Sequence, residues 1–403
     1  MRKANLKKFR VASSETARDI NRRIVLNLVR KNQPISRADL ARQSGLQRST
    51  VSAITEQLIS ERWLLEGATG DLPRGRKPTF LHLNSDRASI IGVDIQPELT
   101  TLAVSSMDMR ILTRESMTTG REPKDFIERL GRRIQDLMRA YPNNSYEGIG
   151  ISVPGRVDIS SHRLTFTPNL HWENVDLKTP LEQLTGLPVQ IENAANACAL
   201  SELWSGRHGE GTSNLVTITV SAGIGVGMIM DGQLLRGSKG TTGEFGHVSI
   251  ETNGPECGCG NRGCWEVMAS NAAAVRHYAE FFTPRKGEVG TKSNMSAIPF
   301  SGLLQLVEQG DPKACKVIDQ MAHHLGVGLA MLVTGLAPDV IVVIGEITRI
   351  WNRVEPIVNA AVRQRSFAHL TTKIVPTDPE NVPRLRGAVA LVAQKHFTPL
   401  HTL

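Results

Sequence analysis

The strongest constraint on the fold is a pattern of strands that occurs twice after residue 88. The first half contains three β-type segments, an amphipathic helix and a buried strand, at residues 90–94, 100–104, 110–113, 126–141 and 148–153. The same order returns in coarser form between residues 215 and 344, where a helical segment over 313–336 precedes an apolar strand. Two such halves predict an α/β body with two similar lobes and a cleft between them.

The length and composition fit a soluble globular protein. The chain has 403 residues, of which 40% are hydrophobic, enough for two or three domains with sizeable cores. Its basic start is not followed by the apolar core of a signal peptide. The most apolar stretch, 325–344, is interrupted by Pro338 and Asp339, so it is a poor membrane-spanning helix. We therefore expect a cytoplasmic protein without membrane insertion.

The positive charge is concentrated at the start of the chain. Residues 1–90 contain 18 Lys and Arg against 8 Asp and Glu, a net charge of +10. The other 313 residues contain 29 and 31, a net charge of −2. A basic head on a near-neutral body indicates a polyanionic partner for the head, and the alternative is a solvated basic face without a ligand.

Three helices and two strands are predicted in this basic head. An apolar stripe marks a helix over 17–31, Ser36 is a good N-cap for a second helix, and Gly45 lies in a tight turn before a third helix over 49–59. Short strands follow at 63–66 and 79–83, with a glycine-rich basic tip between them. This order is that of a winged helix-turn-helix. Such a domain reads the major groove of DNA with the second helix of the helix-turn-helix pair, which here is the third predicted helix.

The exposed polar residues of this head suit DNA. Gln and Arg can hydrogen-bond base edges in pairs, and hydroxyl groups can bind phosphates or bases. An arginine-rich tip suits a narrow minor groove. The alternative is a small helical dimerisation module. The predicted DNA-binding residues are Gln47, Arg48, Ser49, Thr50 and Ser52 at the start of the third helix, and Arg74 and Arg76 on the tip.

A compact cluster of thiols predicts a metal site. Cys257, Cys259 and Cys264 lie within eight residues, and His247 precedes them by ten. Three thiolates and an imidazole complete a closed tetrahedral site, so we expect one structural Zn²⁺ per chain rather than a hydrolytic metal. The alternatives are reduced thiols without a metal or a catalytic or redox cysteine. The remaining cysteines, Cys198 and Cys315, are expected in ordinary helical cores.

Several motifs together resemble the ROK family of repressors, open reading frames and sugar kinases, and in particular its repressor branch. The most specific is Gly243-Glu-Phe-Gly-His247 followed by the cysteine cluster and Glu266. Val153-Pro-Gly-x-Val-Asp158, Asn169-Leu-x-Trp172, Glu192-Asn-x-x-Asn-Ala197 and Ser221-Ala-Gly-Ile-Gly-Val-Gly227 support it. The resemblance covers nearly the whole chain. It implies a two-lobed actin-like and hexokinase-like (ribonuclease H-like) body that binds a sugar in its cleft.

The chain departs from the family's kinases at three positions. Their Asp-x-Gly-Gly-Thr, which approaches ATP phosphates, is here Asp94-Ile-Gln-Pro-Glu98. Their Asn-Asp-Ala-Asn, whose Asp is the general base, is here Asn193-Ala-Ala-Asn196. The later Gly-Gly pair is Gly345-Glu346. Because phosphoryl transfer depends on positioning and on charge stabilisation, the sequence predicts a protein that is not an enzyme.

The sugar side of the motif is better kept. The resemblance implies that Asn193, Glu244, His247 and Glu266 line the sugar, with Gly155 and Asn169 near it. Carboxylate and amide groups suit sugar hydroxyls. His247 can serve both sites only if one ring nitrogen binds zinc and the other faces the sugar. The alternative is that Glu244 and Glu266 only support the zinc loop.

The sequence thus predicts a sugar-responsive transcriptional regulator, most simply a repressor of carbohydrate genes. We expect a DNA-binding domain over 1–85 and a sugar-binding and oligomerisation body over 86–403, with lobes of about 86–195 and 196–403. Its expected partners are duplex DNA with an inverted-repeat operator, a small sugar or sugar phosphate, and a second copy in a homodimer or tetramer. Two alternatives stay open: a sugar kinase with an added DNA-binding head, and a repressor controlled by a transporter protein.

Overall fold

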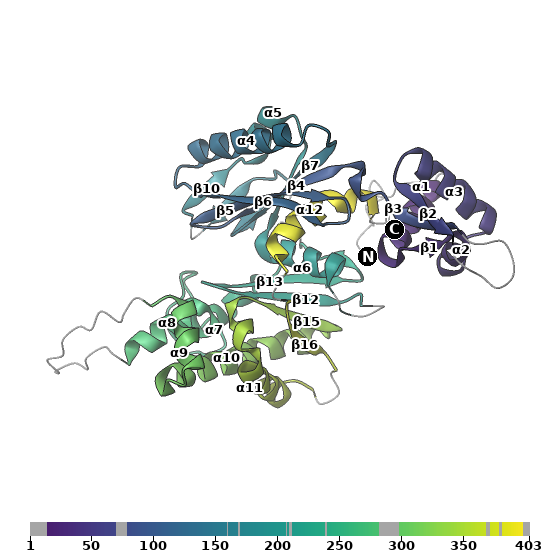
Figure 1. Ribbon diagram of the computed structural model, residues 1–403. Coiled ribbons are helices and arrows are strands. Elements are labelled where there is room, and N and C mark those ends of the chain that lie inside the picture. Colours follow the sequence, from purple (N-terminus) through teal and green to yellow (C-terminus); the bar gives the residue numbers. More distant parts are fainter. Residues whose placement is uncertain are drawn as a thin grey trace, which may run out of the picture.

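The computed structural model describes residues 14–69, 79–158, 160–167, 170–206, 208, 212–237, 240–281, 298–367, 371–378 and 381–397 (Figure 1). A small helical head lies beside a larger body, and the body contains two five-stranded sheets. Among the described residues, no helix is long and apolar enough to cross a membrane.

The head is a winged helix-turn-helix, as predicted. Its elements are α1 (Ser14–Asn32), β1 (Ile35–Ser36), α2 (Arg37–Ser44), α3 (Arg48–Ser60), β2 (Leu64–Thr69) and β3 (Thr79–Leu83). The Ser36 hydroxyl accepts a hydrogen bond from the Asp39 backbone N–H and so caps α2. Gly45 ends α2 at φ 71°, a conformation that glycine adopts without steric cost. The helices pack on a sheet with the order β1-β3-β2.

The first lobe contains the predicted meander. Strands β4 (Ser89–Ile95), β5 (Leu99–Ser106) and β6 (Ile111–Thr118) are antiparallel neighbours, and β7 (Tyr146–Val153) and β11 (Val189–Asn193) continue the sheet in parallel beyond β4. Every residue of β4 is buried. The reason is that helices cover both faces of the sheet: α4 (Pro123–Ala140) packs on one face and α12 (Pro383–Phe397) on the other.

A small extension completes this lobe. It consists of β8 (Arg156–Val157), β9 (Leu164–Thr167) and β10 (Trp172–Val175), followed by α5 (Lys178–Thr185). Trp172 is buried against Phe126 of α4, with the ring centroids 5.1 Å apart. The indole N–H of Trp172 donates to the Arg121 carbonyl, so its polar atom is satisfied inside the core.

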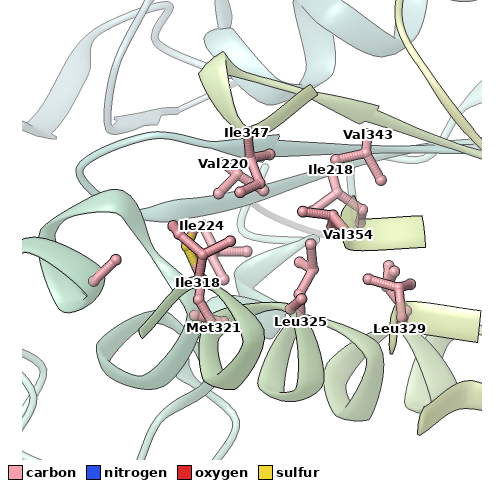
Figure 2. Close-up of a cluster of buried hydrophobic side chains, with 14 of the residues drawn as sticks. Ile218, Val220, Ile224, Ile318, Met321, Leu325, Leu329, Val343, Ile347 and Val354 are labelled. Atoms are coloured by element: carbon pink, nitrogen blue, oxygen red, sulfur yellow. The ribbon is translucent and has the colours of Figure 1, made fainter. Parts of the chain in front are cut away.

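The second lobe repeats the same topology. Strands β12 (Leu215–Val220), β13 (Ile224–Met230) and β14 (Gln233–Leu234) form a meander, and β15 (Val340–Ile344) and β16 (Lys373–Pro376) extend it in parallel. The helices of this lobe are α7 (Trp265–Ala269), α8 (Asn271–Glu280), α9 (Phe300–Glu308), α10 (Pro312–Leu336) and α11 (Trp351–Arg365). Figure 2 shows Ile318, Met321, Leu325 and Leu329 of α10 packed beneath this sheet. The two predicted halves are therefore two similar sheets.

Two helices lie between the lobes. Helix α6 (Ala194–Ser205) packs against β12 and β13, and α12 packs against α6, β4 and β7. The approach is close: a Cβ on Gly150 would lie 1.8 Å from the Ala388 carbonyl oxygen, and one on Gly387 would lie 1.9 Å from the Ala197 carbonyl oxygen. Glycine is therefore required at both contacts. The expected division assigns α12 to the second lobe, whereas in the structure α12 lies against the first sheet.

Candidate functional site

The predicted metal ligands lie together on the second lobe. His247 ends the 3₁₀ turn Glu244–His247, and the three cysteines lie on the loop before α7. Their four ligand atoms, one from each of His247, Cys257, Cys259 and Cys264, all lie within 4.8 Å of one another. The loop closes because Cys257 N–H donates to the Asn261 carbonyl, and because Gly263 has φ 62°, where an added Cβ would lie 1.6 Å from the Glu251 carbonyl oxygen.

The spacing of these atoms fits a tetrahedral metal. Cys257 Sγ lies 3.6 Å from His247 Nδ1, and Cys259 Sγ lies 3.7 Å from Cys264 Sγ. Four ligands at the usual Zn–S length of about 2.3 Å form a tetrahedron with edges of about 3.8 Å. The donor set and these two distances therefore fit a metal ion held by four protein ligands. Cys198 and Cys315 lie on α6 and α10, away from the cluster.

His247 connects the thiol cluster to the cleft. Its Nδ1 faces Cys257 Sγ, and its Nε2 lies 3.7 Å from Glu244 Oε2. The two ring nitrogens therefore face two different sites, as the double role of this residue requires. The imidazole of the thiol cluster is therefore also a neighbour of Glu244.

A cavity of about 190 Å³ lies in the cleft. Five of the six residues implied in sugar binding line it: Gly155, Asn193, Glu244, His247 and Glu266. The sixth, Asn169, lies outside the described residues. The cavity is bordered by segments from both lobes, because Gly155 follows β7 and Asn193 ends β11 of the first sheet, while the other three residues belong to the second lobe.

Hydrogen bonds hold several of these side chains in place. Asn193 Oδ1 accepts from the backbone N–H groups of Ala195 and Asn196 and caps α6, while its Nδ2 donates to the Gly155 carbonyl. Glu266 Oε2 accepts from the Ile224 N–H at 3.0 Å. This bond joins Glu266 to the start of β13 and not to the loop of the cysteines, and the Glu266 carboxylate lines the cavity.

The structure adds two arginines that the motifs did not indicate. Arg156 Nε donates to Glu244 Oε1 at 2.8 Å, and Arg156 lines the cavity. Arg384, at the start of α12, lines it from the other side. Arg156 occupies the variable position of its motif, and Arg384 is almost 200 residues from the nearest motif of the first lobe, so neither gave a local signal.

The head presents most of its predicted DNA-binding residues at one place. Gln47 precedes α3 and is exposed, as are Arg48 and Ser49 in its first turn, while Thr50 and Ser52 are partly buried. The opposite face of α3 carries the predicted buried residues Val51, Ile54 and Leu58. Arg74 and Arg76 lie outside the described residues.

The head contacts the body through the far end of α12. Trp63, which precedes β2, packs against the ring of His396, and the Arg87 guanidinium lies 4.0 Å from the Trp63 ring centroid. Glu147 on β7 accepts hydrogen bonds from Arg87 and His396. A second contact joins α1 to the body, because Arg30 lies over the Trp204 ring and donates to the Trp204 carbonyl.

A winged helix-turn-helix head on a two-lobed body with a polar interlobe cavity defines a DNA-binding transcriptional regulator. A profile described as winged helix-turn-helix DNA-binding matches residues 18–64, and the profile of the ROK family matches residues 90–395. The chain belongs to the ROK family.

Named relatives include regulators and kinases. The xylose repressor of Bacillus subtilis (strain 168) is 29% identical over 399 residues, covering 98% of this chain and 100% of the relative. The transcriptional dual regulator NagC of Escherichia coli (strain K12) is 26% identical over 367 residues, covering 90% of this chain and 89% of the relative. A crystal structure of a ROK family regulator, a homologue of the E. coli MLC protein, superposes with TM-score 0.80 at 26% identity. The superposition covers 95% of this chain and 97% of that regulator.

The body alone resembles a solved kinase. The ROK glucokinase of Streptomyces griseus, in complex with glucose and AMPPNP, superposes with TM-score 0.66 at 29% identity. It covers 76% of this chain and 100% of the glucokinase. The superposition with the regulator therefore includes the DNA-binding head, whereas the superposition with the glucokinase has about the length of the body alone.

Proposed function

We propose that this chain is a sugar-responsive transcriptional repressor in which one helix, α12, links the sugar cavity to the DNA-binding head. The observation that carries the proposal is the position of this helix. Its first turn places Arg384 at the cavity, and its last turn places His396 against Trp63. A change in lobe angle at the cavity therefore moves a rigid element that contacts the head (Figure 1).

The DNA-binding half of the proposal rests on α3. Gln47, Arg48, Ser49, Thr50 and Ser52 are the proposed base and phosphate contacts, with Arg74 and Arg76 in the minor groove. We propose that a homodimer places two heads on an inverted repeat, since a two-fold protein reads a two-fold site. The net charge of +10 over residues 1–90 supports attraction to DNA.

The sugar-binding half rests on the cavity. Glu244, His247 and Glu266 offer hydrogen-bond acceptors and donors on one side, and Asn193 and Gly155 border the other. In the structure the Glu244 carboxylate accepts a hydrogen bond from the Arg156 guanidinium. A sugar hydroxyl that donates to this carboxylate would take the place of that guanidinium N–H. Sugar binding across both lobes would favour one lobe angle and change the spacing of the two heads.

We propose that the body does not phosphorylate its sugar. Ala194, which stands where the family's kinases have their general base, lines the cavity with a methyl group. Among the described residues that line this cavity, Glu244 and Glu266 are the only carboxylates. The alternative of a kinase with an added head predicts ATP-dependent phosphate transfer to the sugar, and a coupled ADP-release assay tests it.

We propose that His247, Cys257, Cys259 and Cys264 hold one structural zinc ion per chain. The ion would fix the thiol loop and the His247 ring, so that Nε2 stays directed toward the cavity. A closed four-ligand site leaves no position for a reacting water, in agreement with a structural role.

The decisive experiment is a titration of the operator complex with sugar. D-xylose, N-acetylglucosamine and other monosaccharides with their phosphates are first screened by thermal shift, because a ligand of the native fold raises its apparent stability. The operator is selected from a pool of randomised duplexes. Saturating ligand should lower operator affinity 5- to 150-fold, a coupling of about 1–3 kcal/mol.

Glu244→Ala separates the two halves of the function. It removes a hydroxyl acceptor from the cavity and leaves the head unchanged, so DNA binding should persist while the response is lost. Glu251→Ala is the control, since Glu251 is exposed between His247 and Cys257 and does not line the cavity. An operator affinity that stays constant at saturating sugar in the wild type would reject direct sugar control and favour regulation by a transporter protein.

A further inference from the structure

A second cavity lies beside the sugar cavity. It has a volume of about 260 Å³ and is bordered by both lobes and by the first turn of α12. Its polar lining consists of Asp94, Gln96, Thr101, Arg114, Asn381 and Arg384. Ile344, Val382, Pro383 and Leu385 provide its apolar wall. Arg384 lines both cavities, so the two spaces meet at this one guanidinium.

The charges of this lining favour an anion. Arg114 is exposed and has no ion pair or hydrogen bond with another described side chain. Arg384 is only partly exposed; it hydrogen-bonds the Cys198 thiol and its charge acts on Asp94, but it has no ion pair with a described carboxylate. An arginine that is partly withdrawn from water without a carboxylate partner at contact distance is a ready site for a phosphate or carboxylate. Glu98 and Glu346, the added acidic residues of the former phosphate-binding motifs, do not line this cavity.

Asp94 does not cancel this preference. The residue is 5% exposed, its Oδ2 accepts from Gln96 Nε2 at 2.7 Å, and its Oδ1 has no hydrogen-bond partner among the described residues. Burial raises the pKa of the Asp94 carboxyl against the opposing effect of Arg384. Protonation, or a donor group brought by a ligand, would satisfy Oδ1, because a buried polar atom without a hydrogen bond is unfavourable.

The remaining groups suit hydroxyls and a short carbon skeleton. Gln96 and Asn381 provide amide groups, Thr101 provides a hydroxyl, and four apolar side chains form the opposite wall. Polar groups with an apolar wall are typical of small-molecule sites.

We propose that this second cavity binds a small hydroxylated organic anion, a phosphate or carboxylate ester or acid of a few carbons, as an effector separate from the sugar. The anionic group lies between Arg114 and Arg384, and the hydroxyls face Gln96, Thr101 and Asn381. Because Arg384 borders both cavities and begins α12, occupancy of the second cavity acts on the same helix as the sugar. The proposal concerns binding alone, so it does not depend on DNA release by sugar.

The test is isothermal titration of the full chain with four matched probes: glycerol, glycerate, glycerol 3-phosphate and inorganic phosphate. Glycerate or glycerol 3-phosphate should bind saturably at one site per chain, and neutral glycerol should not. If the hydroxyls contribute, glycerol 3-phosphate should bind more tightly than inorganic phosphate. The Kd values should differ by at least about tenfold, the effect of one good hydrogen-bonding group. Absence of saturable binding by both hydroxylated anions overturns the proposal.

Three variants test whether the anion binds in the second cavity. Arg114→Ala should weaken binding of the better anion at least about tenfold, as expected for loss of one charge-assisted contact. Arg110→Ala should not change it, because Arg110 is an exposed arginine directly before β6 that pairs with Asp86 and lines neither cavity. Glu244→Ala, which alters only the sugar cavity, should also leave it unchanged. The proposed site would be refuted if Arg114→Ala bound the anion as well as the wild type does, or if Glu244→Ala lost the binding. Tighter binding of ADP than of glycerol 3-phosphate would also refute it.

Discussion

His396 packs against Trp63 with the two ring centroids 4.6 Å apart, so the last turn of the body's final helix contacts the DNA-binding head directly. Phe397, the next residue, lies edge-on to both Trp63 and Trp204. An aromatic cluster between two domains is a discrete packing arrangement rather than a flexible joint, and such arrangements can exist in two alternative states. This contact is where we expect the ligand signal to reach the head.

Removing the His396 ring should uncouple the head from the body. His396→Ala deletes the ring contact with Trp63 and one hydrogen bond to Glu147, while α3 and both cavities keep their residues. The operator affinity without ligand should stay within about threefold, and the ligand-induced change should fall by about 1 kcal/mol, the order of one aromatic contact. Fluorescence anisotropy of labelled operator, with and without ligand, measures both quantities. An unchanged ligand effect would mean that the signal takes another route.

Glu147 should stabilise the junction at neutral pH. Its carboxylate accepts hydrogen bonds from His396 and Arg87 and lies 3.0 Å from the Lys395 ammonium. The hydrogen bond from His396, followed by those from Lys395 and Arg87, holds the pKa of Glu147 well below its usual range. A carboxyl with a lowered folded-state pKa adds stability above its unfolded-state pKa of about 4.3, and this contribution is lost as the pH falls below that value.

Glu147→Gln should therefore be destabilising by about 1.5–3 kcal/mol at pH 7, the range for a hydrogen bond to a charged group. The difference from wild type should shrink as the pH falls from about 5 toward 3. Urea unfolding at several pH values measures it, and Glu128→Gln, at an exposed ion pair on α4, is the control, expected to change stability by less than about 1 kcal/mol. A difference that is constant over this pH range would assign the loss to packing instead.

The local patterns of the sequence were sufficient for most elements of the fold. Strand β15 is a continuous apolar run, β7 carries Ile149, Ile151 and Val153 at every second position, and the three cysteines lie within eight residues, so these features were predictable from short-range spacing. The return of α12 to the first sheet was not, because it depends on contacts such as Gly150 with Ala388, which are more than 200 residues apart. Arg384 was missed for the same reason, since its role follows from the place of α12 and not from its neighbours in sequence.

The base-reading role of α3 predicts a specific loss. Arg48 is exposed in the first turn of α3, the part of a recognition helix that meets base edges. Arg48→Ala should weaken operator binding by about 1–3 kcal/mol and relax the preference at one base position of each half-site. Arg76→Ala should instead weaken binding mainly at A·T-rich flanks. Selection from randomised duplexes with each variant reads both effects, and Arg132→Ala, on the exposed side of α4, is the control.

The thiol cluster predicts a metal-dependent fold of the cavity wall. Cys259→Ser removes the most exposed of the three thiols, so the substitution itself costs little packing, yet it deletes one of four ligands. Because the loop between Cys257 and Cys264 positions His247 and precedes Glu266, loss of the metal should loosen two residues of the sugar cavity. Elemental analysis should find one zinc per wild-type chain and much less in the variant, and the thermal shift with sugar should disappear. Cys315→Ser on α10, outside the cluster, should keep both. Zinc-free wild-type protein that still responds to sugar would reject the structural role of the metal.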